Sequence, residues 1–346
     1  MNFEKEAMAC FPKEIPGLPT QLKFGDLNDI VSLDSSQAGF QDSPWLWGET
    51  WNIGIIPHPF TDVFAEPGLL ANAQWLFAKS RTDYFCDPWL VENESEMVLF
   101  YERFNRKSGR GIICSAFLRR GTDGWALENH QTVIEESFHI SHPCVFNYKE
   151  RWYLIPEAAD SGSIIIYEAV DFPFHWGPGK VLISGFHGVD PVLVHRDGFF
   201  WLFCGNGGTD HDANLHAFFS NSPFGPWTPH LANPIVTGLK GSRPAGPPFF
   251  FTGKLIRPAQ DCRFTYGQAL VFNEILKLSP TEFRESPIMR LSPPSASPYP
   301  HGLHSICHSG ELCVVDGKSF SAIKRLYGPS LVRIRKTKHW WDNVNV

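Results

Sequence analysis

Apolar and polar positions follow one another in pairs of short runs along most of this 346-residue chain. In VDPVLVHRDGFFWLFCGN (189–206), an apolar run begins at Asp190-Pro191 and ends at the turn Asp197-Gly198, after which a second apolar run follows. Two apolar runs joined by Asp-Gly are typical of a β-hairpin. The pattern therefore predicts two antiparallel strands, with Asp190 at the entrance of the first.

The same hairpin pattern occurs five times. Its first strands begin at Asp87-Pro88, His142-Pro143, Asp190-Pro191, Arg243-Pro244 and near His304. Further strand candidates, such as GIICSAFL and SIIIYEAV, follow the hairpins. A repeat of about 50 residues with several strands per unit is the signature of a β-propeller blade. We therefore predict an all-β fold, a five-bladed β-propeller.

The two ends of the chain differ from this repeat. Residues 1–46 have mixed polarity, and we expect an N-terminal extension followed by the propeller over 47–346. The strand WNIGII (51–56) is expected to close the ring by pairing with LYGPSLVRIR (326–335). The run LSPPSASPYP (291–300) should be a surface loop, because its prolines lack the donors of a strand ladder.

Composition narrows the class of protein. Aromatic residues make up 14% of the chain, and Gly and Pro are frequent, which favours short strands joined by turns. The formal net charge is −6, so we expect no nucleic-acid partner. The eight cysteines form no C-x-x-C pair and lie mostly in apolar runs. This pattern predicts buried free thiols in a reducing compartment.

Two further features bear on location. No apolar run approaches the roughly 20 residues that a membrane span needs, so we expect no transmembrane segment. The charged start MNFEKEAMACFPKEIPG has no apolar core of a signal peptide. We therefore expect a cytoplasmic protein.

Propeller geometry predicts that the repeated polar positions converge. The innermost strand of each blade runs along the central channel and the next strand returns antiparallel, so the start of the first and the end of the second share one face. First-strand starts contribute Asp87, His142, Asp190, Arg243 and His304. Second-strand ends contribute Glu102, Glu157, Asn206, Gln260, Asp261 and Asp316. Such a ring of carboxylates, imidazoles and a guanidinium has the composition of a polar-ligand site. The alternative is that an Asp before Pro only accepts hydrogen bonds from the neighbouring blade.

Several stretches resemble the N-terminal domain family of plant glucosamine inositolphosphorylceramide transferases and its bacterial relatives. They are WNIG (51–54), FCDPWLV with VLFYERF, HISHPCVF with WYLIPE, VDPVLV, SRPAG, and RPAQDC with YGQALVFNEI. That family is similar to the five-bladed fold of family 43 glycoside hydrolases. The resemblance implies a carbohydrate-active role, although the transferase activity of the plant proteins is attributed to a separate C-terminal domain.

The resemblance also implies a set of acids. Family 43 hydrolases invert with two Asp and one Glu at the first-strand starts of successive blades. The matching positions here include Asp87, His142 and Asp190, so two Asp are present and the Glu is not at a matching position. Glu157 could reach the channel from a second-strand end.

Three functions are open. The first is a cytoplasmic glycosyltransferase-type activity, in which an activated sugar donor serves glycan or glycolipid assembly, as in polysaccharide biosynthesis. Asp87 or Asp190 would then be the general base, and Arg243 and Arg257 would clamp the donor diphosphate. The second is an inverting glycoside hydrolase with Asp87 as base and Glu157 as acid. Asp190 would tune the pKa of that acid. The third is a non-catalytic sugar-binding module.

The expected partners are a sugar or nucleotide sugar and a glycan or lipid-linked acceptor. No cofactor is firmly predicted, but His142 and His304 could hold a divalent metal together with the Asp residues, or else bind sugar hydroxyls. The expected catalytic residues are Asp87, Asp190 and Glu157. The expected substrate-binding residues are Glu102, His142, Asn206, Arg243, Arg257, Gln260, Asp261 and His304.

Overall fold

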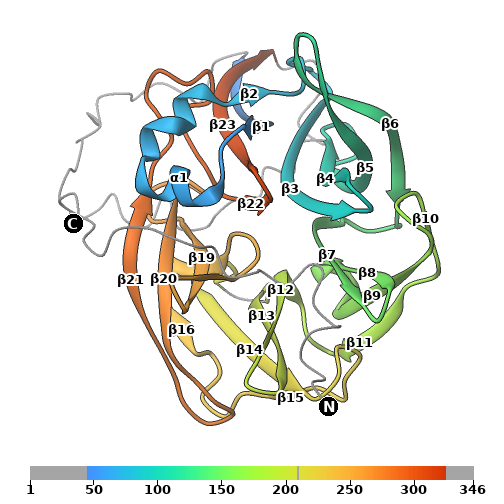
Figure 1. The fold of residues 1–346 in the computed structure, drawn as a ribbon, viewed down its shortest axis with the longest axis vertical. Helices are drawn as coiled ribbons and strands as arrows, with labels where there is room; N and C mark the ends of the chain where they lie inside the picture. The colour runs from blue at the N-terminus through green and yellow to red at the C-terminus, as the bar shows by residue number, and fades with distance from the viewer. Residues whose placement is uncertain (1–44, 209, 325–346) are drawn as a thin grey trace.

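The computed structural model describes residues 45–208 and 210–324, whose strands form five sheets around a central axis (Figure 1). Blade 1 contains β3 (Asp83–Asn93), β4 (Glu96–Asn105), β5 (Arg110–Gly121) and β6 (Gly124–Ile134). Blade 2 contains β7 (Ser141–Tyr148), β8 (Arg151–Glu157), β9 (Ser163–Asp171), β10 (His175–Trp176) and β11 (Lys180–Ser184). Blade 3 contains β12 (Gly188–Arg196), β13 (Phe199–Asn206), β14 (Asn214–Ser220), β15 (Thr228–Pro229) and β16 (Val236–Thr237).

Blade 4 contains β17 (Lys240–Pro244), β18 (Phe249–Phe251), β19 (Lys254–Asp261), β20 (Ala269–Leu278) and β21 (Phe283–Leu291). Blade 5 contains β22 (Ile306–Ser309), β23 (Leu312–Lys324), β1 (Trp45–Ile56) and β2 (Gln74–Trp75). Neighbouring strands within each sheet are antiparallel. The five-bladed β-propeller predicted from the repeat is therefore confirmed, and the proline-rich run after β21 is a loop as expected.

The ring closes between the first and the last described strands. β1 pairs with β23 along its whole length, from Trp45 opposite Lys324 to Ile56 opposite Cys313. Closure by the N-terminal strand is confirmed, but its expected partner was wrong: β23 continues the last hairpin far enough to pair with all of β1. Residues 326–335 lie outside the described part of the chain. The division into an extension (1–46) and a propeller (47–346) stays a prediction for the same reason.

A β-bulge interrupts the first strand of four blades at equivalent places. The strand register shifts between Cys86 and Trp89, Ser141 and Cys144, Val189 and Val192, and Lys240 and Pro244. Asp87, His142 and Asp190 lie inside three of these bulges, with φ angles of 52°, 46° and 46°. Non-glycine residues seldom adopt this left-handed conformation, and bulges re-aim side chains beside functional sites.

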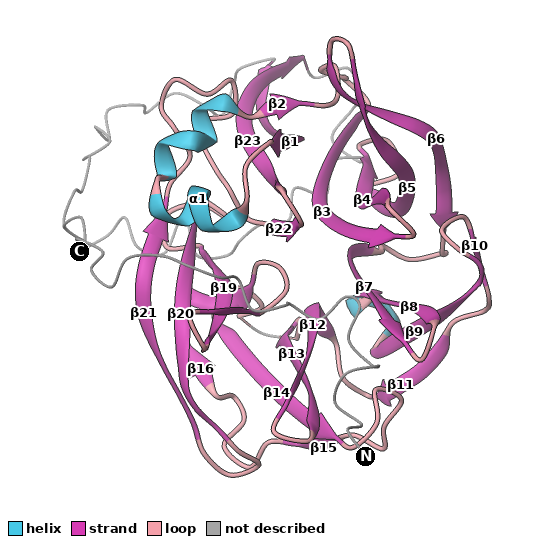
Figure 2. Cartoon of the chain, in the orientation of Figure 1, coloured by secondary structure: helices cyan, strands magenta, loops and turns pink. Residues whose placement is uncertain are grey.

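The apolar sides of the blades pack into two clusters. The larger extends over all five blades, through residues such as Phe100, Leu154, Leu202, Leu255 and Val314. The smaller packs the helices α1 (Phe60–Ala65) and η2 (Pro67–Asn72) against blades 4 and 5, and Figure 2 shows these helices together on one side of the ring.

The helix α1 was not predicted from the sequence. It forms because Phe60, Val63 and Phe64 repeat at helical spacing and bury one face, with Phe60 and Phe249 ring centroids 4.4 Å apart. A third short helix, η3 (Ala159–Ser161), follows β8. Within residues 45–208 and 210–324, no helix has the length and apolar character that a membrane span requires.

Candidate functional site

Charged side chains from all five blades meet at one end of the inner strands. Most of them are fully or almost fully buried. We define the channel cluster as Asp87, Glu102, His142, Glu157, Asp190, Asp212, Arg243, Gln260, His304 and Asp316. Blades 1, 2 and 3 are linked through His142, whose Nδ1 lies 3.9 Å from Oδ1 of Asp87 and 3.9 Å from Oδ1 of Asp190. The structure thus brings the predicted first-strand residues together.

His304 links blade 5 to blade 1. Its Nδ1 lies 2.6 Å from Oδ2 of Asp316 and its Nε2 lies 3.2 Å from Oδ1 of Asp87. Burial by itself would lower the pKa of His304, but the Asp316 and Asp87 carboxylates outweigh it and raise the pKa to about 10. In turn, burial would raise the pKa of Asp87, but the His304 charge and hydrogen bonds from His142 and His304 hold it well below its usual value. At neutral pH Asp87 is therefore a carboxylate beside an imidazolium.

Arg243 is the centre of a second group of contacts. Its Nε donates to Oδ2 of Asp190 at 2.5 Å, its Nη1 to Oδ1 of Asp212 at 2.8 Å, and its Nη2 to Oε2 of Glu157 at 3.3 Å. Gln260 Nε2 also donates to Oδ2 of Asp190, at 2.9 Å. Burial would raise the pKa of Asp190, but the Arg243 charge outweighs it and the pKa is lowered. A single guanidinium thus holds three carboxyl groups from blades 2 and 3 and the loop that follows β13.

The surroundings of Glu102 shift its pKa in the opposite direction from those of Asp87 and Asp190. Glu102 lies across from Cys86, whose Sγ donates to its Oε2 at 3.0 Å, and its Oε1 is 3.8 Å from Nε2 of His139. Burial, followed by the Asp87 charge, raises the pKa of Glu102 well above its usual value. Blade 1 therefore carries a carboxyl group with a raised pKa, Glu102, near one with a lowered pKa, Asp87.

Arg257 and Asp261 do not face the channel, and the expectation that they line it is wrong. Arg257 Nη2 and Nε bind the Glu285 carboxylate at 2.6 and 2.9 Å, and Asp261 binds Arg263 and Arg290, each at 2.9 Å. The physical reason is the alternation of side chains along β19. Gln260 points to the channel, so its neighbour Asp261 and Arg257, which shares the parity of Asp261, point to the other face.

Asn206 also lies outside the channel cluster, against expectation. Glu102 and Glu157 pair with the residues just before the bulges, Cys86 and Ser141. In blade 3 that place belongs to Gly205, which pairs with Val189, and Asn206 is one residue further along. A one-residue offset turns a side chain to the other face of a strand. The Oδ1 of Asn206 instead accepts a hydrogen bond from the Gly208 amide at 3.1 Å.

Two members of the site were not found from the sequence. Asp212 comes from the loop after β13, and Tyr266 comes from the loop between β19 and β20. The Tyr266 ring lies over Arg243, with 4.9 Å between its centroid and Cζ. Strand periodicity does not extend into loops, so it cannot place these residues.

Three possible metal ligands lie close together in the same region. Cys86, Asp87 and His304 each place one possible ligand atom within 4.8 Å of the others. However, both His304 nitrogens face carboxylates and carry protons, and burial holds the pKa of the Cys86 thiol well above its usual value. Protonated in this way, Cys86 and His304 offer no lone pair to an ion, and a metal held by the His and Asp residues stays a prediction.

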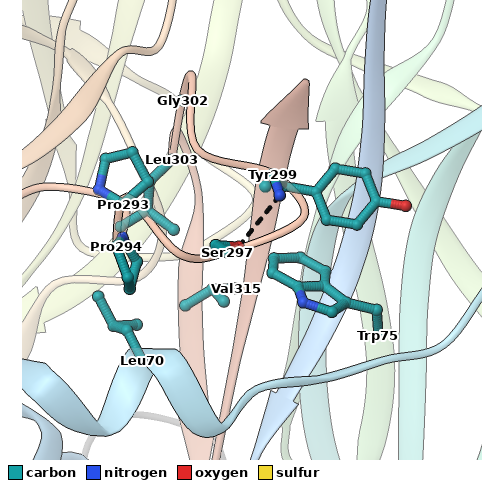
Figure 3. Close-up of a pocket in the computed structure, with 10 residues that line it drawn as sticks. Leu70, Trp75, Pro293, Pro294, Ser297, Tyr299, Gly302, Leu303 and Val315 are labelled. Atoms are coloured by element: carbon teal, nitrogen blue, oxygen red, sulfur yellow. Dashed lines mark hydrogen bonds between the residues drawn. The ribbon is translucent and has the colours of Figure 1, made fainter. Parts of the chain in front are cut away.

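A small pocket lies away from the channel cluster, where η2, the proline-rich loop and β23 meet (Figure 3). It is lined by Leu70, Trp75, Pro293, Tyr299 and Val315, among others. Val315 and Gly317, which also lines the pocket, flank Asp316 in β23. Side chains alternate in a strand, so the pocket and the channel cluster lie on opposite faces of β23.

Solved structures similar to this chain include carbohydrate hydrolases, at low identity. One is Zg3597, a family 117 glycoside hydrolase of Zobellia galactanivorans, with 14% identity, a TM-score of 0.47, and coverage of 72% of this chain and 88% of that one. Another is a xylan β-1,4-xylosidase of Bacillus halodurans C-125, with 17% identity, a TM-score of 0.45, and coverage of 61% and 48%. The fold assignment depends on the strand pairing and not on these matches.

Relatives in sequence are more similar. The chain is 35% identical over 212 residues to glucosamine inositolphosphorylceramide transferase 1 of Oryza sativa subsp. japonica, covering 60% of this chain and 28% of that protein. It is 33% identical over 213 residues to the protein of that name from Arabidopsis thaliana, covering 59% and 27%. The match thus spans less than a third of the length of these relatives. Residues 64–295 match the family model described as glucosamine inositolphosphorylceramide transferase 1, N-terminal. The resemblance drawn from the sequence is confirmed: this chain belongs to the family of the N-terminal domain of glucosamine inositolphosphorylceramide transferase 1.

Proposed function

We propose that this domain binds a sugar at the channel cluster and serves glycosyl transfer in glycan or glycolipid assembly. The observation that carries the proposal is the charge of the cluster. Five carboxyl groups, those of Asp87, Glu157, Asp190, Asp212 and Asp316, face two described cations, Arg243 and His304. An excess of buried carboxylates stabilises the positive charge that a sugar develops while its glycosidic bond breaks.

The names of the relatives support a particular ligand class. They are named glucosamine inositolphosphorylceramide transferases, and glucosamine is an amino sugar. An amino sugar carries hydroxyl groups and an ammonium, and carboxylates accept hydrogen bonds from both. We therefore infer that the ligand is a hexose with an amino group, bound with the ammonium toward the carboxylates.

Asp87 is the carboxylate that would act on the acceptor. Asp190 is held by Arg243 and Gln260, whereas Asp87 is held through Oδ1 by His304 and through Oδ2 by the His142 amide. Its low pKa makes it a charged acceptor at any physiological pH. We propose that Asp87 accepts the hydrogen bond of the acceptor hydroxyl and orients it for attack.

The proposal gives the arginines a different role from the one expected. Arg257 lies outside the cluster, and all three nitrogens of Arg243 already contact carboxylates. Neither guanidinium is free to clamp a diphosphate. Arg243 instead positions Asp190, Asp212 and Glu157.

A second candidate, glycoside hydrolysis, is favoured by one observation. A protonated carboxyl group and an ionised one in the same site form an acid and base pair. The raised pKa of Glu102 and the lowered pKa of Asp87 suit these two roles. Glu157, the acid expected from the sequence, is a poorer candidate, because its Oε2 already accepts from Arg243 Nη2 at 3.3 Å and from the Asp190 amide at 3.4 Å.

Incubation with sugar substrates separates these functions. The chain is mixed with a panel of nucleotide sugars, with and without glycan acceptors, and with aryl glycosides. Released nucleotide, released aglycone and equilibrium binding are measured. Asp87→Asn removes the charge without new backbone strain, since Asn tolerates a positive φ. Asp197→Asn is the matched control, at φ 51° in an exposed turn.

Transfer predicts nucleotide release that Asp87→Asn abolishes and Asp197→Asn preserves. Aryl glycoside cleavage that Glu102→Gln abolishes, with no donor present, would favour hydrolysis instead. Saturable binding without either reaction would reduce the function to recognition. A wild-type chain that binds no sugar would refute the proposal.

The cytoplasmic location stays a prediction; the seven cysteines of the described part are buried and free, as a reducing compartment would leave them.

A further inference from the structure

Tyr266 lies beside the channel cluster and is only half-buried, whereas the charged residues around it are buried. Its ring centroid lies 4.9 Å from Arg243 Cζ and 5.2 Å from the His304 ring centroid. It therefore touches both cations of the cluster. Since it is also partly exposed, Tyr266 lies at the edge of this group of contacts that faces solvent.

The loop that carries Tyr266 is held tightly in place. Lys318 is completely buried, and its Nζ donates to the Tyr266 carbonyl and, at 3.3 Å, to Oγ1 of Thr265. The Leu303 amide donates to the Gly267 carbonyl at 2.9 Å. Gly267 has a φ of +57°, and a Cβ there would lie 2.4 Å from Cβ of His304. Only glycine lets the loop lie so close to His304, so the position of Tyr266 is built into the fold.

The Tyr266 hydroxyl is available as a donor. Among residues 45–208 and 210–324 it has no hydrogen-bond partner, and its ring is held by Arg243 and His304 instead. Burial raises the pKa of Tyr266 well above its usual value; Arg243 opposes this, and the Asp190, Asp87 and Asp212 charges add to it. The phenol therefore keeps its proton beside groups that are mostly acceptors.

We infer that Tyr266 contacts the ligand, donating its phenolic hydrogen to a ring or glycosidic oxygen of the bound sugar. The inference rests on the proposed function for the identity of the ligand. The sugar hydroxyls and ammonium give hydrogens to the carboxylates, while its ether oxygens can only accept, and Tyr266 supplies a donor for them. A sugar with this contact is positioned in one orientation over Asp87.

The test titrates the wild-type chain and three variants, two at tyrosines and one at an aspartate, with the methyl glycoside of glucosamine. Binding is monitored by NMR. Tyr266→Phe removes one oxygen and keeps the ring against Arg243. Tyr148→Phe is the matched control, because Tyr148 is also half-buried but ends β7 at the far end from the channel cluster. Asp87→Asn reports separately on the proposed function. Thermal unfolding of each variant checks that the fold is kept.

Tyr266→Phe is expected to weaken binding by about five- to tenfold, the loss of one hydrogen bond, with Tyr148→Phe at the wild-type affinity. If Asp87→Asn abolishes binding and Tyr266→Phe has no effect, the role of Tyr266 is wrong and the proposed function stands. If the wild-type chain does not bind the glycoside, both are wrong. If Tyr148→Phe weakens binding as much as Tyr266→Phe, the effect is not a contact with the ligand, and the inference is also wrong.

Discussion

Replacing Arg243 with methionine removes the guanidinium that contacts Asp190, Asp212 and Glu157. Methionine fills much of the space but leaves three buried carboxyl groups without their cation. Removing one partner of a buried ion pair costs about 3–5 kcal/mol. We expect Arg243→Met to lower the free energy of unfolding by about this amount at neutral pH.

This loss of unfolding free energy should depend on pH, and the pKa values of the carboxyl groups determine whether it grows or shrinks as the pH falls. In the wild type the pKa of Asp190 is lowered, so its contribution is present above the pKa of the unfolded chain and is lost as pH falls below it. Without Arg243, burial raises the pKa of the same group above its unfolded value. The variant then binds protons on folding and regains stability as the pH falls. The difference in free energy of unfolding between the wild type and Arg243→Met should therefore become smaller as the pH falls.

Urea unfolding at about pH 7.5 and about pH 4.5 measures both effects. Arg151→Met is the control, since the Arg151 side chain is 69% exposed and its ion pair with Glu168 should contribute less than about 1 kcal/mol. A variant that folds only near the lower pH would agree with the account. If Arg243→Met loses less than about 1 kcal/mol of unfolding free energy at neutral pH, or loses the same amount at both pH values, then Arg243 does not stabilise the buried carboxyl groups as described.

Three further outcomes are expected. The pKa of His308, which stacks on Phe60, is lowered by burial to about 4, so folding favours its neutral form. Stability should then fall as pH falls from about 6.5 toward 4, by at most about 3 kcal/mol, and His308→Phe should remove this part of the acid sensitivity in unfolding curves. Gly267→Ala adds a side chain at positive φ against His304, so it should lower the free energy of unfolding by at least about 1–2 kcal/mol and weaken sugar binding. A variant that unfolds like the wild type would show that the loop is not packed tightly against His304. Because burial raises the pKa of Glu102, folding at neutral pH must overcome the cost of holding its proton; Glu102→Gln removes this cost and should therefore keep or increase the free energy of unfolding at neutral pH, whereas a large loss would mean that Glu102 is ionised.

The strands and the first-strand residues of the site could be predicted from the sequence. Apolar runs, Asp-Gly turns and a repeat of about 50 residues are local signals, and propeller geometry then places Asp87, His142, Asp190, Arg243 and His304 on one face. These inferences need only the order of the strands. They do not need the exact register.

The second-strand residues could be predicted only in part, because their orientation depends on register. Glu102, Glu157 and Gln260 face the channel, while Asn206 and Asp261 are each one residue out of phase. The bulges shift the register by one residue in blades 1, 2 and 3 and by two in blade 4, and the residue pattern does not specify which side chain then turns inward. Loop residues such as Tyr266 depend on contacts distant in sequence, here Lys318 and Leu303.

The central claim is that a sugar binds at the channel cluster. A crystal structure of the chain soaked with the methyl glycoside of glucosamine tests it most directly. We predict electron density for the sugar beside Asp87, with its amino group near the carboxylates around Arg243 and an oxygen within hydrogen-bonding distance of the Tyr266 hydroxyl. Density for the sugar only at another place, such as the pocket beside Trp75 and Tyr299, would contradict the claim.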